Sequence, residues 1–119
     1  LTPDSPDTDS PVMRKIEREM IQAIVDRRGW HKSNTVVKVH NPHHVEVLLH
    51  GNSIAHYYSD GAGVLEIDHC GWTTPTTKSR LNAILQLVTG SANVFQKDYA
   101  WYLTMPGGTV TPFNGKMFL

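Results

Sequence analysis

Apolar side chains recur at intervals of three and four residues in two stretches of the chain, a spacing that places them on one face of an α-helix. In the first stretch, Pro11 suits the first turn and Gly29 the position just beyond the last turn. In the second stretch, Thr74 is a good N-cap, Pro75 a good first helical residue and Gly90 a stop signal. The pattern predicts two amphipathic helices, one over residues 11–28 and one that, with its preceding loop, occupies residues 71–89.

Between these helices the period of the apolar positions changes to two, which is typical of β-strands. Short turns rich in glycine, asparagine and proline separate four such segments, so the strands are expected to form an antiparallel meander. Two more strands are expected to form a hairpin after the second helix, and Gly107–Gly108 precedes a last extended piece. The predicted strands are residues 35–40, 45–50, 54–58 and 64–68, the hairpin pairs 94–96 with 101–103, and the last piece is 109–111.

This order of elements predicts an α+β fold. It consists of an N-terminal helix, a four-stranded antiparallel meander, a second amphipathic helix packed on the sheet and a C-terminal hairpin. A chain of 119 residues suits one domain. Residues 1–10 carry Asp4, Asp7 and Asp9 but almost no apolar side chain, so they are interpreted as a flexible acidic tail that precedes a single domain over residues 11–119.

The apolar stripe of the first helix has two interpretations. Such a stripe is more often part of the intramolecular core, but its two methionines and three isoleucines are apolar enough for a seam with another copy or with a host protein. The interface hypothesis rests on Met13, Ile16, Met20 and Ile24.

The overall charge argues against a strong, sequence-blind nucleic-acid binder, since eleven basic residues balance eleven acidic ones. Without the acidic tail, however, eleven bases face eight acids, and the remaining body is mildly basic. A single cysteine, Cys70, excludes an internal disulfide and fits a reducing compartment. No signal-peptide pattern and no long apolar run is present, so the sequence favours an intracellular, cytoplasmic protein without a membrane partner.

The most distinctive polar segment opens the second helix, where four threonines, a serine, a lysine and an arginine fall close together. A helix N-terminus attracts anions, so this segment is a candidate phosphate site, although helix capping also explains its threonines. Aromatic residues of the hairpin beside lysine are typical of a stacking surface for single strands. The predicted nucleic-acid or anion-binding residues are Thr73, Thr76, Thr77, Lys78, Ser79, Arg80, Lys97 and Tyr99.

Catalytic and metal signatures are weak. His40, His43 and His44 surround one turn and are the best metal candidates, but their spacing matches no established zinc pattern. His69 and Cys70 are neighbours that would face opposite sides of a strand, so His69 would not activate the thiol. The sequence therefore predicts no catalytic residue, no bound metal and no cofactor.

Two segments resemble a pattern found in small uncharacterised proteins of bacteriophages and bacteria. The first is LHGNSIA at residues 49–55 with the leucine before it, and the second is GWTTPTTKSRLN at residues 71–82. Val94–Lys97 and Trp101–Tyr102 fit the closing hairpin of that pattern, and the match covers roughly residues 34–104. The resemblance implies a phage-like or mobile-element context and carries over no activity and no catalytic residue.

These observations favour a small phage-like binding module that is not an enzyme and that associates with nucleic acid. The alternative is a protein-interaction or assembly module, either a homo-oligomer or an inhibitor of a host protein. A histidine-based metal-binding protein is the third hypothesis.

Overall fold

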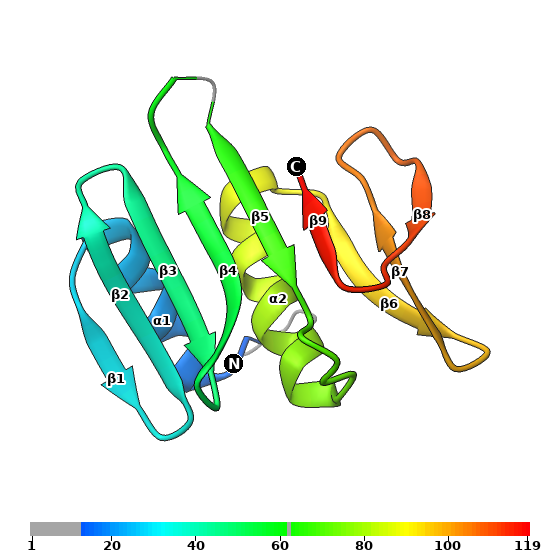
Figure 1. The fold of residues 1–119 in the computed structure, drawn as a ribbon, viewed down its shortest axis with the longest axis horizontal. Coiled ribbons are helices and arrows are strands. Elements are labelled where there is room, and N and C mark those ends of the chain that lie inside the picture. Colours follow the sequence, from blue (N-terminus) through cyan, green and yellow to red (C-terminus); the bar gives the residue numbers. More distant parts are fainter. Residues whose placement is uncertain (1–12, 62) are drawn as a thin grey trace, which may run out of the picture.

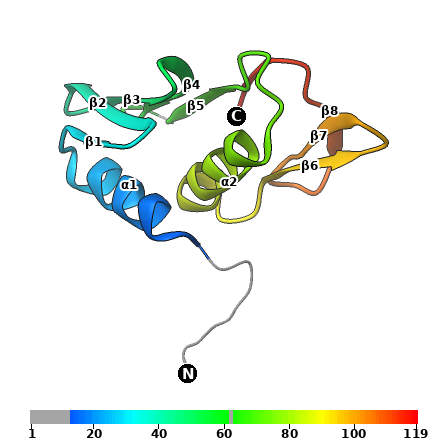
Figure 2. The ribbon, with the colours of Figure 1, turned by 90° about the horizontal axis from the view of Figure 1, so that it is seen from below.

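Two helices lie on one side of a large antiparallel sheet, and a smaller sheet continues the chain beyond the second helix (Figures 1 and 2). The computed structural model describes residues 13–61 and 63–119. The predicted acidic tail lies outside these described residues. The helices are α1 (Lys15–Asp26) and α2 (Pro75–Thr89), and the strands are β1 (Trp30–Lys32), β2 (Thr35–Asn41), β3 (His44–Leu49), β4 (Asn52–Tyr58), β5 (Val64–Asp68), β6 (Asn93–Lys97), β7 (Ala100–Thr104), β8 (Val110–Pro112) and β9 (Lys116–Phe118).

Helix α1 ends earlier than the sequence pattern predicts. The expected last residue was Arg28 with Gly29 beyond it, but Arg27 already adopts the left-handed conformation, with a φ of 53°. The backbone N–H of Arg28 donates to the carbonyl of Ala23 at 2.9 Å, and the Arg27 guanidinium donates to the carbonyl of Ile24 at 2.6 Å. These bonds satisfy two carbonyls of the last helical turn, and the left-handed Arg27 takes the position that a glycine often occupies.

Helix α2 confirms the predicted start and stop signals. The Thr74 side chain accepts a hydrogen bond from the Thr77 N–H at 3.2 Å, and Pro75 is the first helical residue. At the other end Gly90 has a φ of 76°. The boundaries therefore follow from the capping chemistry read in the sequence.

The predicted antiparallel meander corresponds to β2, β3, β4 and β5, but the sheet has six strands in the order β1-β2-β3-β4-β5-β9. The expectation of four strands is therefore corrected. Both added strands have three residues and lie at opposite edges of the sheet. Such short strands show no useful periodicity, and β9 exists through pairing with β5, almost fifty residues earlier in the chain.

The predicted hairpin of β6 and β7 is present, and β8 adds a third strand beside β7. This small sheet is anchored to α2 by Asn82. The amide nitrogen of Asn82 donates to the Val94 carbonyl at 3.0 Å, and its oxygen accepts from the Val94 N–H at 2.6 Å. Asn82 thereby satisfies part of the free edge of β6, as a neighbouring strand would.

The core lies between the helices and the inner face of the large sheet, and it continues under the small sheet. Met20 and Ile24 are fully buried in this core, while Met13 and Ile16 are partly buried near the start of α1. Met20 and Ile24 are therefore covered within the chain itself and do not present a surface for another copy. The largest fully buried side chains are Phe113, Met20, Ile54, Leu65, Ile67, Leu81, Ile84, Leu85, Leu103, Val37, Val45 and Val94.

Candidate nucleic-acid interface

The polar residues at the start of α2 divide into an inward and an outward group. Arg80 is only 3% exposed, and its guanidinium Nη1 lies 2.7 Å from Oε2 of Glu17 on α1. Its Nε donates to the Thr35 hydroxyl on β2 at 3.1 Å, and the Ser79 hydroxyl donates to the same Glu17 oxygen. Three elements of the fold therefore meet at one buried ion pair.

This network changes the interpretation of the predicted anion site. Thr77 is also buried, where its N–H bonds to the Thr74 cap. In this structure the side chains of Ser79 and Arg80 therefore bind Glu17 and Thr35 within the chain and stabilise the packing of α2 against α1 and β2. Thr73 is exposed, and Thr76, Lys78 and Ser79 are partly exposed, but the Ser79 hydroxyl is bonded to Glu17. Thr73, Thr76 and Lys78 are therefore the predicted residues of the helix start whose polar groups are most available to a ligand.

A cavity of about 360 Å³ opens beside this outward group, between the loop before α2 and the turn that joins β3 to β4. Buried Leu49 and Ile54 form its apolar part. Trp72 stands at the cavity and is 56% exposed, which is a large exposed area for an indole. The cavity is lined by Leu49, His50, Asn52, Ile54, Trp72, Thr74, Thr76 and Thr77.

Backbone contacts hold the Trp72 loop in place. The Gly71 N–H donates to Nδ1 of His69 at 3.0 Å, and the Trp72 N–H donates to the His69 carbonyl at 2.8 Å. The His69 ring is buried and packs edge-on against Phe113, with ring centroids 5.0 Å apart. The exposed indole is thus carried by a loop that is anchored in the core.

Sequence reasoning missed Trp72, His50 and Asn52 as site residues. Tryptophan is more often a core residue, and the two others appear as ordinary turn residues. One signal was available, because Trp72 lies between Gly71 and Thr73 in a segment without another apolar side chain. An indole in such a polar loop does not belong to an apolar stripe that would face the core, so it is a candidate for solvent exposure.

The other predicted residues, Lys97 and Tyr99, lie at the β6–β7 turn. Tyr99 is 97% exposed and has a φ of 67°, in the left-handed region that bulky residues rarely adopt. On the same hairpin, Phe95 and Tyr102 stack with centroids 5.5 Å apart, and both are partly exposed. Trp101, by contrast, is buried in the core and does not belong to an exposed stacking surface.

The candidate metal residues do not form a metal site. His43 is an exposed turn residue, whereas His40 and His44 stack on the outer face of the large sheet. Within residues 13–61 and 63–119, no group of three or more His, Cys, Asp or Glu side chains is placed to hold a metal ion.

The single cysteine is poorly suited to nucleophilic chemistry. Burial, together with the charge of Asp68, raises the pKa of the Cys70 thiol, although Lys116 acts in the opposite direction. The Cys70 Sγ–H donates to the Ser53 carbonyl at 3.1 Å. A protonated thiol held in this way is a weak nucleophile.

The fold and these surfaces define a small α+β protein with exposed aromatic side chains, Trp72 at the cavity and Tyr99 at the β6–β7 turn. The comparison with protein-family models gives a match over residues 13–119 to the family described as Kyanoviridae Gp96 protein. The chain therefore belongs to this phage protein family, which confirms the phage context that the sequence resemblance implied. No curated protein and no solved structure gives a significant match. In the part of the chain that the structure describes, no helix is long and apolar enough to span a membrane.

Proposed function

We propose that this Gp96-family protein is a non-enzymatic module that binds single-stranded nucleic acid at the Trp72 cavity. The observation that carries the proposal is the exposed indole of Trp72 beside an apolar cavity of about 360 Å³. A nucleobase is flat, apolar on its faces and polar at its edges, and unstacked bases bind proteins by stacking on aromatic rings. The cavity volume lies within the usual range for small-ligand sites.

The surroundings of Trp72 suit the two parts of a nucleotide. The exposed indole of Trp72 offers the face on which a base would stack, while Asn52 and Thr76 bring polar groups that can bond to its edge. Lys78 lies one turn into α2 on the same segment and supplies charge for a phosphate. This division of labour is how single-strand binders combine stacking with electrostatic attraction.

Lys97 and Tyr99 are proposed as a second contact. A fully exposed tyrosine in a left-handed turn position costs about 1–3 kcal/mol of backbone strain, and its ring has almost no contact within the chain that offsets this cost. A stacking contact with a ligand would offset this cost and give the exposed ring a role at the tip of the hairpin. Lys97, next to the turn, supplies a neighbouring charge.

The experiment is a titration of fluorescent single-stranded and double-stranded oligonucleotides at low and moderate salt. The parent protein is expected to bind the single strand more tightly. Stacking of one base contributes about 1–3 kcal/mol, so Trp72→Ala should weaken binding by about 5- to 150-fold, and Trp72→Phe should restore part of it. The plot of log affinity against log salt concentration has a negative slope. Lys78→Ala should make this slope shallower, by about 0.7 for one lost phosphate contact with a single strand.

Two control variants separate the cavity from the general surface. Phe118→Ala removes another exposed aromatic ring, and Lys15→Ala removes an exposed lysine on α1. Both are expected to bind like the parent. The proposal is wrong if the parent protein shows no binding at low salt, or if Trp72→Ala binds the single strand as well as Phe118→Ala does.

A further inference from the structure

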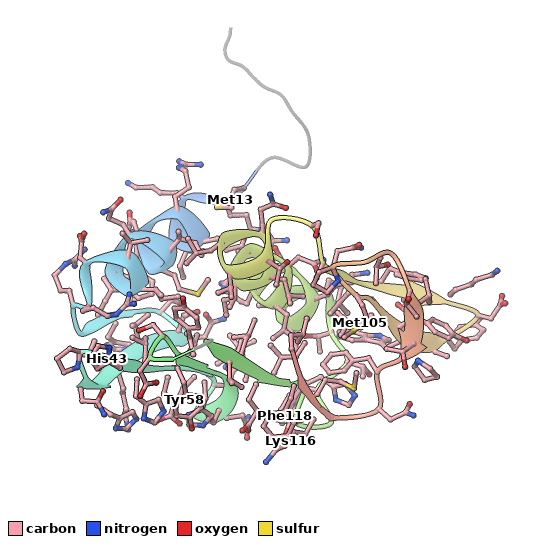
Figure 3. All side chains as sticks on the ribbon, turned by 90° about the horizontal axis from the view of Figure 1, so that it is seen from above. Met13, His43, Tyr58, Met105, Lys116 and Phe118 are labelled. Atoms are coloured by element: carbon pink, nitrogen blue, oxygen red, sulfur yellow. The ribbon has the colours of Figure 1, made fainter. Side chains whose placement is uncertain are left out.

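Three histidines gather on the outer face of the large sheet, the face opposite both helices. They are His40 on β2, His44 on β3 and His56 on β4. In Figure 3 the labelled Tyr58, Lys116 and Phe118 mark this face, because they lie on the side of the sheet away from α1 and α2. The site proposed for nucleic acid uses none of these side chains.

One hydrogen bond joins two of the three imidazoles, and the Glu46 carboxylate links the third imidazole to this pair. Nε2 of His44 lies 2.9 Å from Nδ1 of His56, and Nε2 of His56 lies 2.9 Å from the Ser53 hydroxyl. Nε2 of His40 lies 2.7 Å from Oε1 of Glu46, whose other oxygen is 3.7 Å from Nε2 of His56. One continuous polar chain therefore crosses β2, β3 and β4.

The contact between His44 and His56 depends on protonation. A hydrogen bond between two imidazole nitrogens requires that one carries a proton and the other does not. If both rings become imidazolium ions, both nitrogens are donors, the bond is lost, and two positive charges lie on rings whose centroids are 5.2 Å apart. The pair therefore tolerates at most one added proton without rearranging.

Charged groups on every neighbouring strand face this cluster. Lys38 on β2 and Glu46 on β3 lie directly opposite each other, and Glu66 on β5 lies opposite His56. Beyond them, Lys116 on β9 pairs with Glu66 at 3.4 Å. The titratable and charged groups of this face are Lys38, His40, His44, Glu46, His56, Tyr58, Glu66, Asp68 and Lys116. With neutral histidines the carboxylates outnumber the lysines, and protonation of the histidines reverses that balance.

The electrostatics of two members agree with this geometry. Burial, reinforced by the charges of His40 and His56, lowers the pKa of His44, although Glu46 opposes the shift. For Glu46, burial acts to raise the pKa, but hydrogen bonds from His40 and Ser53 and the nearby histidine charges outweigh it and lower the pKa. The folded state therefore favours a neutral His44 beside an ionised Glu46.

We propose that the His40–His44–His56 cluster is a proton-operated switch in the outer face of the large sheet. Near neutral pH the His44–His56 hydrogen bond ties β3 to β4 on this face. On acidification the second proton breaks that bond, while protonated His40 stays on the Glu46 carboxylate. The face then changes from a hydrogen-bonded surface with a slight excess of carboxylates to a looser surface with net positive charge. A protein surface that changes in this way binds its partners in a pH-dependent manner.

The sign of the stability change follows from the lowered pKa of His44. The stability that comes from keeping His44 neutral is complete above its unfolded value of about 6.5, and it is lost as the pH falls through the lower folded value. The stability that comes from ionised Glu46 is lost only below its ordinary value of about 4.5. The switch should therefore act at mildly acidic pH, before the carboxylate titrates.

The test is an NMR titration of the imidazole resonances of the full chain between pH 8 and pH 4.5, with urea midpoints measured over the same range. The His44 imidazole is expected to titrate below its ordinary value of about 6.5, because the neutral ring is the form that the contact with His56 favours. His44→Phe keeps an aromatic ring at the position that stacks on Tyr58, where the centroids are 4.3 Å apart, and should remove most of the loss of the urea midpoint between pH 7 and pH 5. His43→Asn should change neither.

Two results would overturn the proposal. One is a His44 imidazole that titrates at or above its ordinary value of about 6.5 in the folded protein. The other is a His44→Phe variant that loses as much of its urea midpoint between pH 7 and pH 5 as the parent does. Because the readout involves no ligand, it stands apart from the nucleic-acid proposal.

Discussion

Replacing Arg80 by methionine removes the cation from the buried pair that joins α1, α2 and β2. The variant leaves the Glu17 carboxylate, which is 3% exposed, with the Ser79 hydroxyl but without its guanidinium partner. Breaking a buried ion pair from one side costs about 3–5 kcal/mol, because an uncompensated charge stays in the interior. Domains of this kind have a total stability of about 5–15 kcal/mol, so the loss is a large part of the whole.

The assay is urea unfolding followed by circular dichroism. With a slope of about 2 kcal/mol per M, the Arg80→Met variant is expected to unfold at a midpoint about 2 M lower than the parent. Arg80→Lys retains the charge but cannot reproduce the contacts with both Glu17 and Thr35, so its loss should be intermediate. Lys78→Met, a change of a partly exposed neighbour on the same helix, should stay within about 0.5 kcal/mol.

A double-mutant cycle refines the test. Removing both charges with Glu17→Met and Arg80→Met leaves no buried ion, so the double variant should be more stable than the sum of the two single losses predicts, by about 2 kcal/mol or more. The reasoning is refuted if Arg80→Met costs less than about 1 kcal/mol, or if the two losses simply add. A variant that keeps its stability but loses ligand binding would return Arg80 to the surface role that the sequence suggested.

Three further predictions concern side chains outside this pair. Asn82→Leu removes both hydrogen bonds to the Val94 backbone and should destabilise the protein by about 2–4 kcal/mol in urea unfolding, with increased self-association if the edge of β6 is freed. Thr74→Ala removes the N-cap of α2 and should cost about 1 kcal/mol, whereas Thr74→Ser should restore most of it. Replacing Asp98–Tyr99 by Asn–Gly, the preferred pair for a turn with two positive φ values, should raise the melting temperature by a few degrees; an unchanged or lower melting temperature would show that the tyrosine is not strained.

The helices and the meander could be predicted because their signals are local. Apolar periodicity, the Thr74–Pro75 start and the Gly90 stop act within a few residues of one another. Strand β9 could not be predicted this way, since its three residues acquire their role only by pairing with β5. The last extended piece, predicted over residues 109–111, corresponds to β8, but its pairing with β7 could not be predicted from so short a segment.

The burial of Arg80 could not be predicted from the sequence near it. Basic and hydroxyl residues at the start of a helix are typical of a solvent-exposed segment, but the Arg80 guanidinium is buried in an ion pair with Glu17 on α1. A clue was present in the first helix, where Glu17 occupies the stripe between Met13 and Met20 at helical spacing and so faces the core. A buried acid in that position requires a buried base, and only the tertiary structure identifies Arg80 as that base.

The most direct test of the proposed function is the fluorescence of Trp72 during titration with a single-stranded oligonucleotide. The chain has three tryptophans, and Trp101 is only 5% exposed, so a Trp30→Phe variant leaves Trp72 as the exposed indole. Stacking of a base in the cavity predicts saturable quenching at low salt that is weaker with a duplex of the same sequence. Emission that stays unchanged while the oligonucleotide binds, or the absence of any binding at low salt, would contradict the proposal that the Trp72 cavity holds a nucleobase.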